Sequence, residues 1–268
     1  MKKLLGILLF SITSLVYAKD TIITIGASPV PQAEILKQIK PILKAQGIDL
    51  QIKEFSDYVQ PNLLVEQKQL DANFFQHKPY MEQFNKEHGT HLVSLIGVHI
   101  EPMGVYASSN PKLTEFVKSK DPTKLPKGLT IGVPNDTTNE GRALLLLQQN
   151  KIITLKPNVA YPTKKDIVTN PYNVTIKELD AGMIARNLVA HQLDLAVINS
   201  NYAIQSNLNP VLDAVFIESN QSPYVNIIAI RPEELREPQM QALAKAIKSK
   251  QVTDFIFKNY KGAVVPVN

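Results

Sequence analysis

"TIITIGASPVPQAEILKQIKPILKAQGIDLQIKEF", residues 21–55, decides the expected fold. Its start, residues 21–28, is an apolar run typical of a buried strand, and residues 48–55 alternate apolar and polar side chains as a half-buried strand does. Between them, residues 31–47 carry apolar side chains at helical spacing, namely Ile35, Leu36, Ile39, Ile42 and Leu43. A strand, a helix and a second strand in this order predict a β–α–β unit and hence a parallel sheet.

The same pattern restarts after the loop-rich residues 110–128. "LTIGVPNDTTNEGRALLLLQQN", residues 129–150, predicts a strand, a polar turn and a helix. Further strands are expected within residues 172–180, 193–203 and 222–230, and helices within residues 232–250 and 252–260. We therefore expect an α/β fold of two lobes, each a mostly parallel sheet flanked by helices. The predicted division gives residues 19–106 and 225–268 to lobe 1, and residues 107–224 to lobe 2.

The N-terminus predicts export from the cytoplasm. Lys2 and Lys3 precede the short apolar run of residues 4–16, which is typical of a signal peptide over residues 1–18, with cleavage near Ala18. The chain contains no cysteine, so no cysteine could carry a lipid anchor. From these features we expect a soluble protein of the periplasm without a lipid anchor.

Composition and motifs argue against several function classes. Removing Lys2 and Lys3 leaves 27 basic residues against 24 acidic ones, a formal charge of about +3 with no block of like charge, so nucleic acid is not an expected partner. The chain lacks G-x-S-x-G, G-x-G-x-x-G, H-E-x-x-H and a phosphate-binding loop. His77, His88, His91 and His99 are close in sequence, but their spacing fits no standard metal site. We expect no enzyme activity, no metal and no cofactor.

Two motifs contain candidate ligand-binding residues. In "PNDTTNEGR", residues 134–142, the start of a helix and the guanidinium of Arg142 could hold an anion together. Equally, Asn139 or Thr138 could simply cap that helix, with Arg142 on the surface. In "FFQHKPY", residues 74–80, three side chains could form a pocket wall or a packed turn: Phe75, His77 and Tyr80.

Three further residues stand at the ends of predicted strands. Tyr58 follows one strand, a usual position for a ligand contact in an α/β sheet and also for an ordinary boundary residue. Asn199 and Asn226 lie at the edges of apolar strands, where an amide could bind an amino acid or cap a turn.

Taken in order, five motifs resemble the NlpA family, the methionine-binding proteins of ABC importers. They are "FSDYVQPN", "LDANFFQHKPY", "GVPNDTTNEGRALLLLQ", "LAVINSNYA" and "SPYVNIIAI", and the resemblance runs from about residue 22 to the C-terminal helices. It implies a two-lobed periplasmic binding protein of type II-like fold, joined by a hinge. It also implies that the protein binds L-methionine, or D-methionine or a short methionine peptide. The implied partner is an inner-membrane ABC permease with its cytoplasmic ATPase, and the protein would act as a monomer.

The resemblance also implies roles for the candidate residues. Arg142 would bind the ligand's carboxylate, and Asn199 and Asn226 its amino-acid head group. The pocket for the thioether chain would be lined by Tyr58, Phe75, His77 and Tyr80, with Asn139 nearby in the motif of Arg142. Family members usually carry a lipid-anchored cysteine, which this chain lacks. Nothing in the sequence identifies a partner for the ligand's ammonium.

Other functions stay open at this point. One is the binding of a methionine-containing dipeptide or another apolar amino acid, because one methylene changes binding by only about 1–3 kcal/mol. A second is an enzyme on the same scaffold, with His77 as general base. A third, adhesion to host components, requires only secretion and a stable fold.

Overall fold

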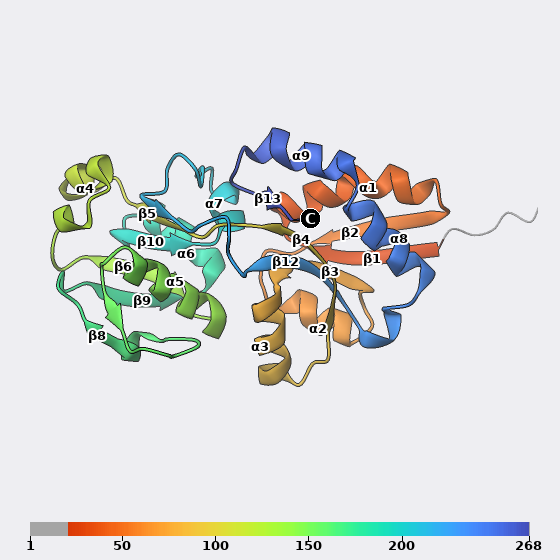
Figure 1. Ribbon diagram of the computed structural model, residues 1–268, viewed down its shortest axis with the longest axis horizontal. Coiled ribbons are helices and arrows are strands. Elements are labelled where there is room, and N and C mark those ends of the chain that lie inside the picture. The colour runs from red at the N-terminus through yellow and green to blue at the C-terminus, as the bar shows by residue number, and fades with distance from the viewer. Residues whose placement is uncertain (1–20, 268) are drawn as a thin grey trace, which may run out of the picture.

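The computed structural model describes residues 21–267, and the predicted signal peptide lies outside them. Two β-sheets, each covered by helices, form two lobes that lie side by side (Figure 1). The two-lobed α/β class predicted from the sequence is confirmed. Among the described residues, no helix is long and apolar enough to cross a membrane.

The first sheet has the strand order β13-β4-β12-β3-β1-β2. Its strands are β1 (Thr21–Ala27), β2 (Ile48–Glu54), β3 (Ala72–His77), β4 (Val93–Ile100), β12 (Val225–Ile230) and β13 (Val265–Pro266). β1 pairs in parallel with β2 and β3, as the opening β–α–β unit predicts. β12 returns from the other lobe and is antiparallel to both β3 and β4, and β13 is antiparallel to β4. The sheet is therefore mixed and not mostly parallel as expected, because strands that return from elsewhere in the chain enter it in the opposite direction.

Both faces of the first sheet are covered by helices. Their bounds are α1 (Glu34–Lys44), α2 (Gln60–Glu66), α3 (Lys78–His88), α8 (Pro238–Ile247) and α9 (Lys250–Tyr260). Ile35, Leu243 and Ile256 of α1, α8 and α9 pack with the sheet in one buried cluster. Val65 of α2 and Met81 of α3 belong to a second cluster, which packs against Ile227 and Ala229. Burial on both faces explains why the strand residues read as apolar runs.

The second sheet has the strand order β11-β5-β10-β6-β9. Its strands are β5 (Gly104–Ala107), β6 (Thr130–Pro134), β9 (Thr175–Leu179), β10 (Leu195–Ile198) and β11 (Phe216–Ile217), and a separate pair is β7 (Thr154–Leu155) with β8 (Ile167–Thr169). The helices are α4 (Thr114–Ser119), α5 (Thr137–Gln149), α6 (Ala181–Val189) and α7 (Ser200–Gln205). Val197 packs with α4 and α5, whereas Ile198 packs with α6 and α7. Successive side chains of β10 therefore fill opposite faces, as the period of a strand requires.

Short 3₁₀ or irregular turns complete the chain. They are η1 (Pro29–Ala33), η2 (Pro111–Leu113), η3 (Pro122–Lys124), η4 (Lys164–Asp166) and η5 (Pro232–Glu234). The expected helix of residues 31–47 is thus shorter, because η1 precedes it.

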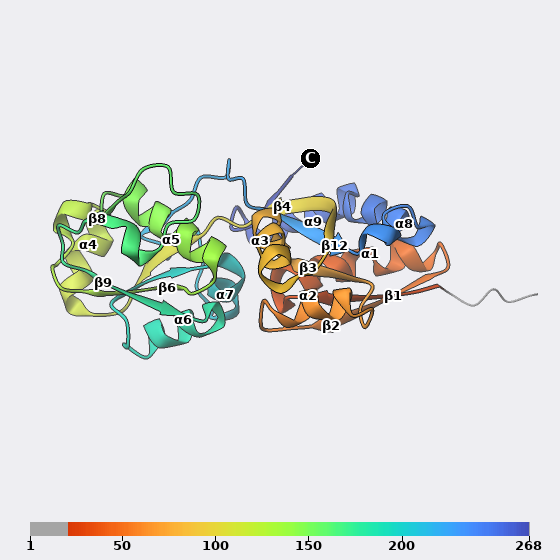
Figure 2. The ribbon, with the colours of Figure 1, turned by 90° about the horizontal axis from the view of Figure 1, so that it is seen from below.

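The chain passes between the sheets at two places, residues 101–103 and residues 218–224. The boundary predicted at residue 106 cuts through β5, whose partners β10 and β11 belong to the second sheet. An extended run shows no sign of which sheet it will join, because pairing depends on distant strands. The assignment of residue ranges to the two lobes stays a proposal, with its first crossing moved to residues 101–103. α3 and α5 face each other across the two lobes (Figures 1 and 2).

Candidate functional site

A small, partly open cavity lies between the two lobes. It is lined by all eight residues singled out in the sequence: Tyr58, Phe75, His77, Tyr80, Asn139, Arg142, Asn199 and Asn226. Four more line it that sequence reasoning missed: Gln76, Glu101, Ser200 and Asn201. The structure thus brings together segments of the chain that are up to 168 residues apart, from Tyr58 to Asn226.

Aromatic rings from the first lobe form one wall. Tyr58 lies 5.7 Å from Phe75 and 5.9 Å from Tyr80 between ring centroids, and Phe75 and Tyr80 are also 5.9 Å apart. The Tyr80 hydroxyl donates to the Tyr58 backbone carbonyl at 2.9 Å, which holds the two rings together. His77 ends β3 and caps α3, because its Nδ1 accepts from the Tyr80 backbone N–H at 3.1 Å. "FFQHKPY" is therefore both a capped turn and a cavity wall.

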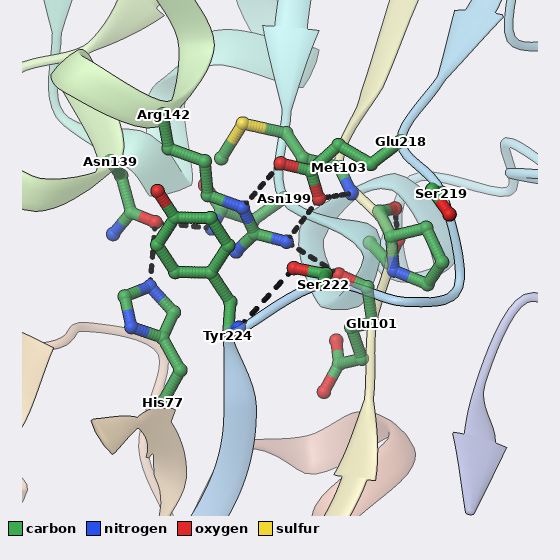
Figure 3. A network of polar contacts seen from close by, with 12 residues as sticks. His77, Glu101, Met103, Asn139, Arg142, Asn199, Glu218, Ser219, Ser222 and Tyr224 are labelled. Carbon is green, nitrogen blue, oxygen red and sulfur yellow. Dashed lines mark hydrogen bonds and ion pairs between the residues drawn. The ribbon is translucent and has the colours of Figure 1, made fainter. Parts of the chain in front are cut away.

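His77 connects the two lobes through its other ring nitrogen. Since Nδ1 accepts a hydrogen bond, Nε2 carries the proton and donates to Asn139 Oδ1 at 3.0 Å (Figure 3). Burial, and then the nearby charge of Arg142, lowers the pKa of His77 to about 3. The ring is therefore neutral at physiological pH, in agreement with this hydrogen-bond pattern.

This burial predicts that the protein loses stability in acid. The native state keeps His77 neutral, whereas the unfolded chain takes up a proton below about pH 6.5, so the free energy of unfolding falls as the pH falls from 6.5 toward 3. We expect His77 to contribute about 2 kcal/mol of loss between pH 6.5 and 4.5. Urea unfolding of wild type and His77→Gln at both pH values measures it, and the variant should lose about 2 kcal/mol less.

His191→Asn provides the matched control. His191 is exposed, and its backbone is in the left-handed region, which asparagine tolerates. It should keep the wild-type pH dependence. If His77→Gln also kept it, the assignment of this pH dependence to His77 would be wrong.

Arg142 lies on α5 and is 3% exposed. Its Nε and Nη2 donate to the Glu218 carboxylate at 2.8 and 2.6 Å, and Nη2 also donates to the Glu101 backbone carbonyl at 2.8 Å (Figure 3). Tyr224 stacks 4.3 Å from the guanidinium carbon. Burial alone would lower the pKa of Arg142, but the charge of Glu218 raises it overall. Arg142 thus contacts both crossings between the lobes, which the sequence did not suggest.

The cap of α5 is neither Asn139 nor Thr138. Asp136 is the capping residue, and its carboxylate accepts from the backbone N–H and the side-chain amide of Asn139. With its Nδ2 used in this way, Asn139 turns its Oδ1 toward the cavity, where it accepts from His77 and from Asn199 Nδ2.

Two asparagines at the start of α7 have buried polar atoms without a partner. Asn199 Nδ2 donates to Asn139 Oδ1 at 3.1 Å, and Asn199 Oδ1 has no hydrogen bond among the described residues. Asn201 Oδ1 accepts from the Tyr58 hydroxyl at 2.6 Å, and in the described chain its Nδ2 is likewise unpaired. Buried polar atoms are rarely left unpaired, so an acceptor and a donor here are available to a ligand. In the sequence, Asn201 could have been identified by its position two residues after Asn199 in "NSNY", residues 199–202.

Glu101 is a buried acid in the same cavity, 6% exposed. Its Oε1 accepts from Gln32 Nε2 at 2.6 Å and from His99 Nε2 at 2.7 Å, while Oε2 makes no hydrogen bond within residues 21–267. Asn226 Oδ1 accepts weakly from Gln32 at 3.4 Å. In the sequence, Glu101 could have been identified as an acidic residue directly after an apolar strand, because α/β sheets bind ligands at the ends of their strands.

The cavity thus combines an aromatic wall, a buried carboxylate, a guanidinium and amide groups with unpaired atoms. Comparison with known proteins identifies the family of the chain. The family model described as NlpA lipoprotein matches residues 23–268. The chain belongs to the NlpA lipoprotein family.

Several members are similar over most of their length. The methionine-binding lipoprotein MetQ of Bacillus subtilis is 40% identical over 250 residues, which is 92% of this chain and 88% of that protein. A nutrient-binding protein from Burkholderia cenocepacia, solved bound to methionine, is 39% identical with a TM-score of 0.84, covering 92% of this chain and all of that one. An ABC-transporter periplasmic substrate-binding protein from Coxiella burnetii is 34% identical with a TM-score of 0.83, covering 91% of this chain and all of that one.

One expectation from the sequence is overturned by the NlpA assignment. The absence of cysteine led to the expectation of a soluble periplasmic protein without a lipid anchor. The family is described as lipoproteins, and its Bacillus subtilis member is named one. That expectation is therefore wrong.

Proposed function

We propose that this protein is the substrate-binding subunit of an ABC importer, and that it binds methionine between its lobes and delivers it to an inner-membrane permease. The observation that carries the proposal is one cavity with acceptors, donors and an aromatic wall, which together complement a zwitterion with an apolar side chain. Two relatives support the ligand: one is named methionine-binding and one was solved bound to methionine.

The ammonium of the ligand is assigned to Glu101. Its Oε2 is unpaired in the described chain, and the unpaired Asn199 Oδ1 offers a second acceptor. A hydrogen bond between ionised groups contributes about 1.5–3 kcal/mol. Glu101 therefore takes the role for which the sequence offered no residue.

The carboxylate is assigned to donors on both lobes. Nε and Nη2 of Arg142 donate to the Glu218 carboxylate, and Nη2 also donates to the Glu101 backbone carbonyl. Within residues 21–267, no hydrogen bond uses Nη1 of Arg142. Asn201 Nδ2 is a second donor, and Asn226 a third, because its hydrogen bond from Gln32 occupies only the carbonyl oxygen. The ligand's carboxylate would thus meet one edge of a guanidinium that is already ion-paired.

The thioether side chain would pack against Tyr58, Phe75 and Tyr80. Each contact between sulfur and an aromatic ring contributes about 0.3–1.5 kcal/mol. The Tyr80 hydroxyl donates to the Tyr58 backbone carbonyl within the first lobe, so this contact between the two residues does not depend on closure of the lobes.

Delivery would rest on opening and closing of the lobes. The hydrogen bonds His77–Asn139 and Tyr58–Asn201 join residues from the two lobes, so they require the closed arrangement. A ligand that contacts both lobes favours closure by population shift. The closed form would then dock on the permease as a monomer, and a separate cytoplasmic subunit would hydrolyse ATP.

We also propose that the protein does not turn its ligand over. The candidate base for an enzyme was His77, but its Nδ1 accepts from a backbone N–H and its Nε2 donates to Asn139. Neither nitrogen is left to take a proton from a bound molecule.

The test is native mass spectrometry of the purified protein, followed by denaturation and identification of what is released. Methionine is expected, with a thermal shift on adding methionine to emptied protein. A methionine dipeptide or another apolar amino acid would keep the binding role and replace the ligand, and a competition series including D-methionine would rank them. An empty protein without a thermal shift at millimolar methionine would contradict the proposal, and a chemically altered ligand would favour an enzyme.

A further inference from the structure

The Glu101 carboxylate accepts hydrogen bonds from two buried side chains that do not line the cavity. Gln32 lies in η1, where it is 1% exposed, and His99 lies on β4, where its exposure is 0%. Both direct an N–H at the same oxygen, Glu101 Oε1, at 2.6 and 2.7 Å. Both hydrogen bonds therefore use Oε1, and within residues 21–267 none is made by Oε2.

His99 contacts Glu101 through one ring nitrogen only. Its Nε2 donates to Glu101, and its Nδ1 is buried without a partner in the described chain. A lone pair at Nδ1 can be buried there at modest cost, whereas a proton would add a buried donor with no acceptor. His99 therefore directs its Nε2–H at Glu101 Oε1, and no group of the described chain accepts a hydrogen bond from Nδ1.

Within residues 21–267, no lysine or arginine side chain forms an ion pair with Glu101. Arg142 contacts only the backbone carbonyl of Glu101 and gives its charge to Glu218, and in Figure 3 the Glu101 carboxylate points away from that guanidinium. A buried carboxylate without a counter-ion is unfavourable until a cation reaches it.

We propose that Gln32 and His99 are positioning residues that fix Glu101 so that the site requires a free ammonium on its ligand. This inference rests on the proposed function and extends it to the selection of one chemical group. The selection acts on the ammonium and not on the carboxylate or the side chain. Analogues with an acylated or missing amino group would then bind more weakly than methionine.

Calorimetric titration with two ligands tests the proposal: L-methionine, and 4-(methylthio)butanoic acid, which keeps the carboxylate and thioether but lacks the ammonium. Wild type should prefer methionine about 10- to 100-fold, the value of a hydrogen bond between ionised groups. His99→Leu should lose most of that preference by binding methionine more weakly, with the affinity for the des-amino acid changed less than about 2-fold. His99→Gln, whose amide can replace the Nε2–H donor, should restore it.

Two further variants keep the outcomes separate. Gln32→Met removes the other donor to Glu101 Oε1 and should also reduce the preference for methionine. It replaces His99→Leu in the titrations if that variant does not fold. His91→Leu is the control, because the side chain of His91 is 75% exposed. An unchanged preference in folded His99→Leu and Gln32→Met would overturn the positioning role while leaving methionine binding intact. Equal binding of both ligands by wild type would also overturn it, and binding of neither would instead refute the proposed function.

Discussion

Arg142→Met is expected to lower the free energy of unfolding by about 3–5 kcal/mol, because it leaves a buried carboxylate without its cation. The side chains of Arg142 and Glu218 are only 3% and 10% exposed, and their two parallel hydrogen bonds are 2.8 and 2.6 Å long. The same substitution removes a donor proposed for the ligand's carboxylate, so methionine affinity should fall as well. Urea unfolding of the ligand-free protein measures the first effect, and calorimetry the second.

A double variant separates the charge from the packing. Adding Glu218→Leu removes the unpaired carboxylate and should recover most of the stability but not the methionine affinity. Arg186→Met serves as the control, since Arg186 lies exposed on α6 and should cost less than about 0.5 kcal/mol. A loss below about 1 kcal/mol in Arg142→Met would contradict the structural role of the ion pair.

Glu101→Gln should weaken methionine binding about 10- to 100-fold while the fold stays intact. Glutamine keeps the shape and an oxygen acceptor for Gln32 and His99, but it lacks the charge that the ammonium requires. The affinity for 4-(methylthio)butanoic acid should not fall, because that ligand has no ammonium. Calorimetric titration of both ligands measures the difference.

The control for this variant is Glu115→Gln, an exposed acid on α4 in the second lobe. It should bind both ligands like wild type. If Glu101→Gln bound methionine with wild-type affinity, the ammonium would have to be held elsewhere, with Asn199 Oδ1 the remaining acceptor.

Much of the fold could be predicted from the sequence, because secondary structure follows local patterns. The apolar run of β1, the helical spacing of α1 and the alternation of β2 each reflect which faces are buried. The sheet membership of β5 could not be predicted, since an extended segment carries no local sign of its distant partner. For the same reason no local signal predicts that β12 pairs with β3, because the paired residues His77 and Asn226 are 149 positions apart.

The sequence by itself determined the residue types of the site and their motifs: the capped turn at His77, the helix start before Arg142 and the asparagines at strand ends. Only the tertiary structure decided which buried charges are paired. Arg142 meets Glu218 across 76 positions, and Glu101 meets Gln32 across 69. Neither pairing has a local pattern, because a hydrogen bond between side chains depends on distance in space and not along the chain. That pairing leaves Glu101 without a lysine or arginine partner among the described residues, and so as the group that the ammonium of a ligand would complete.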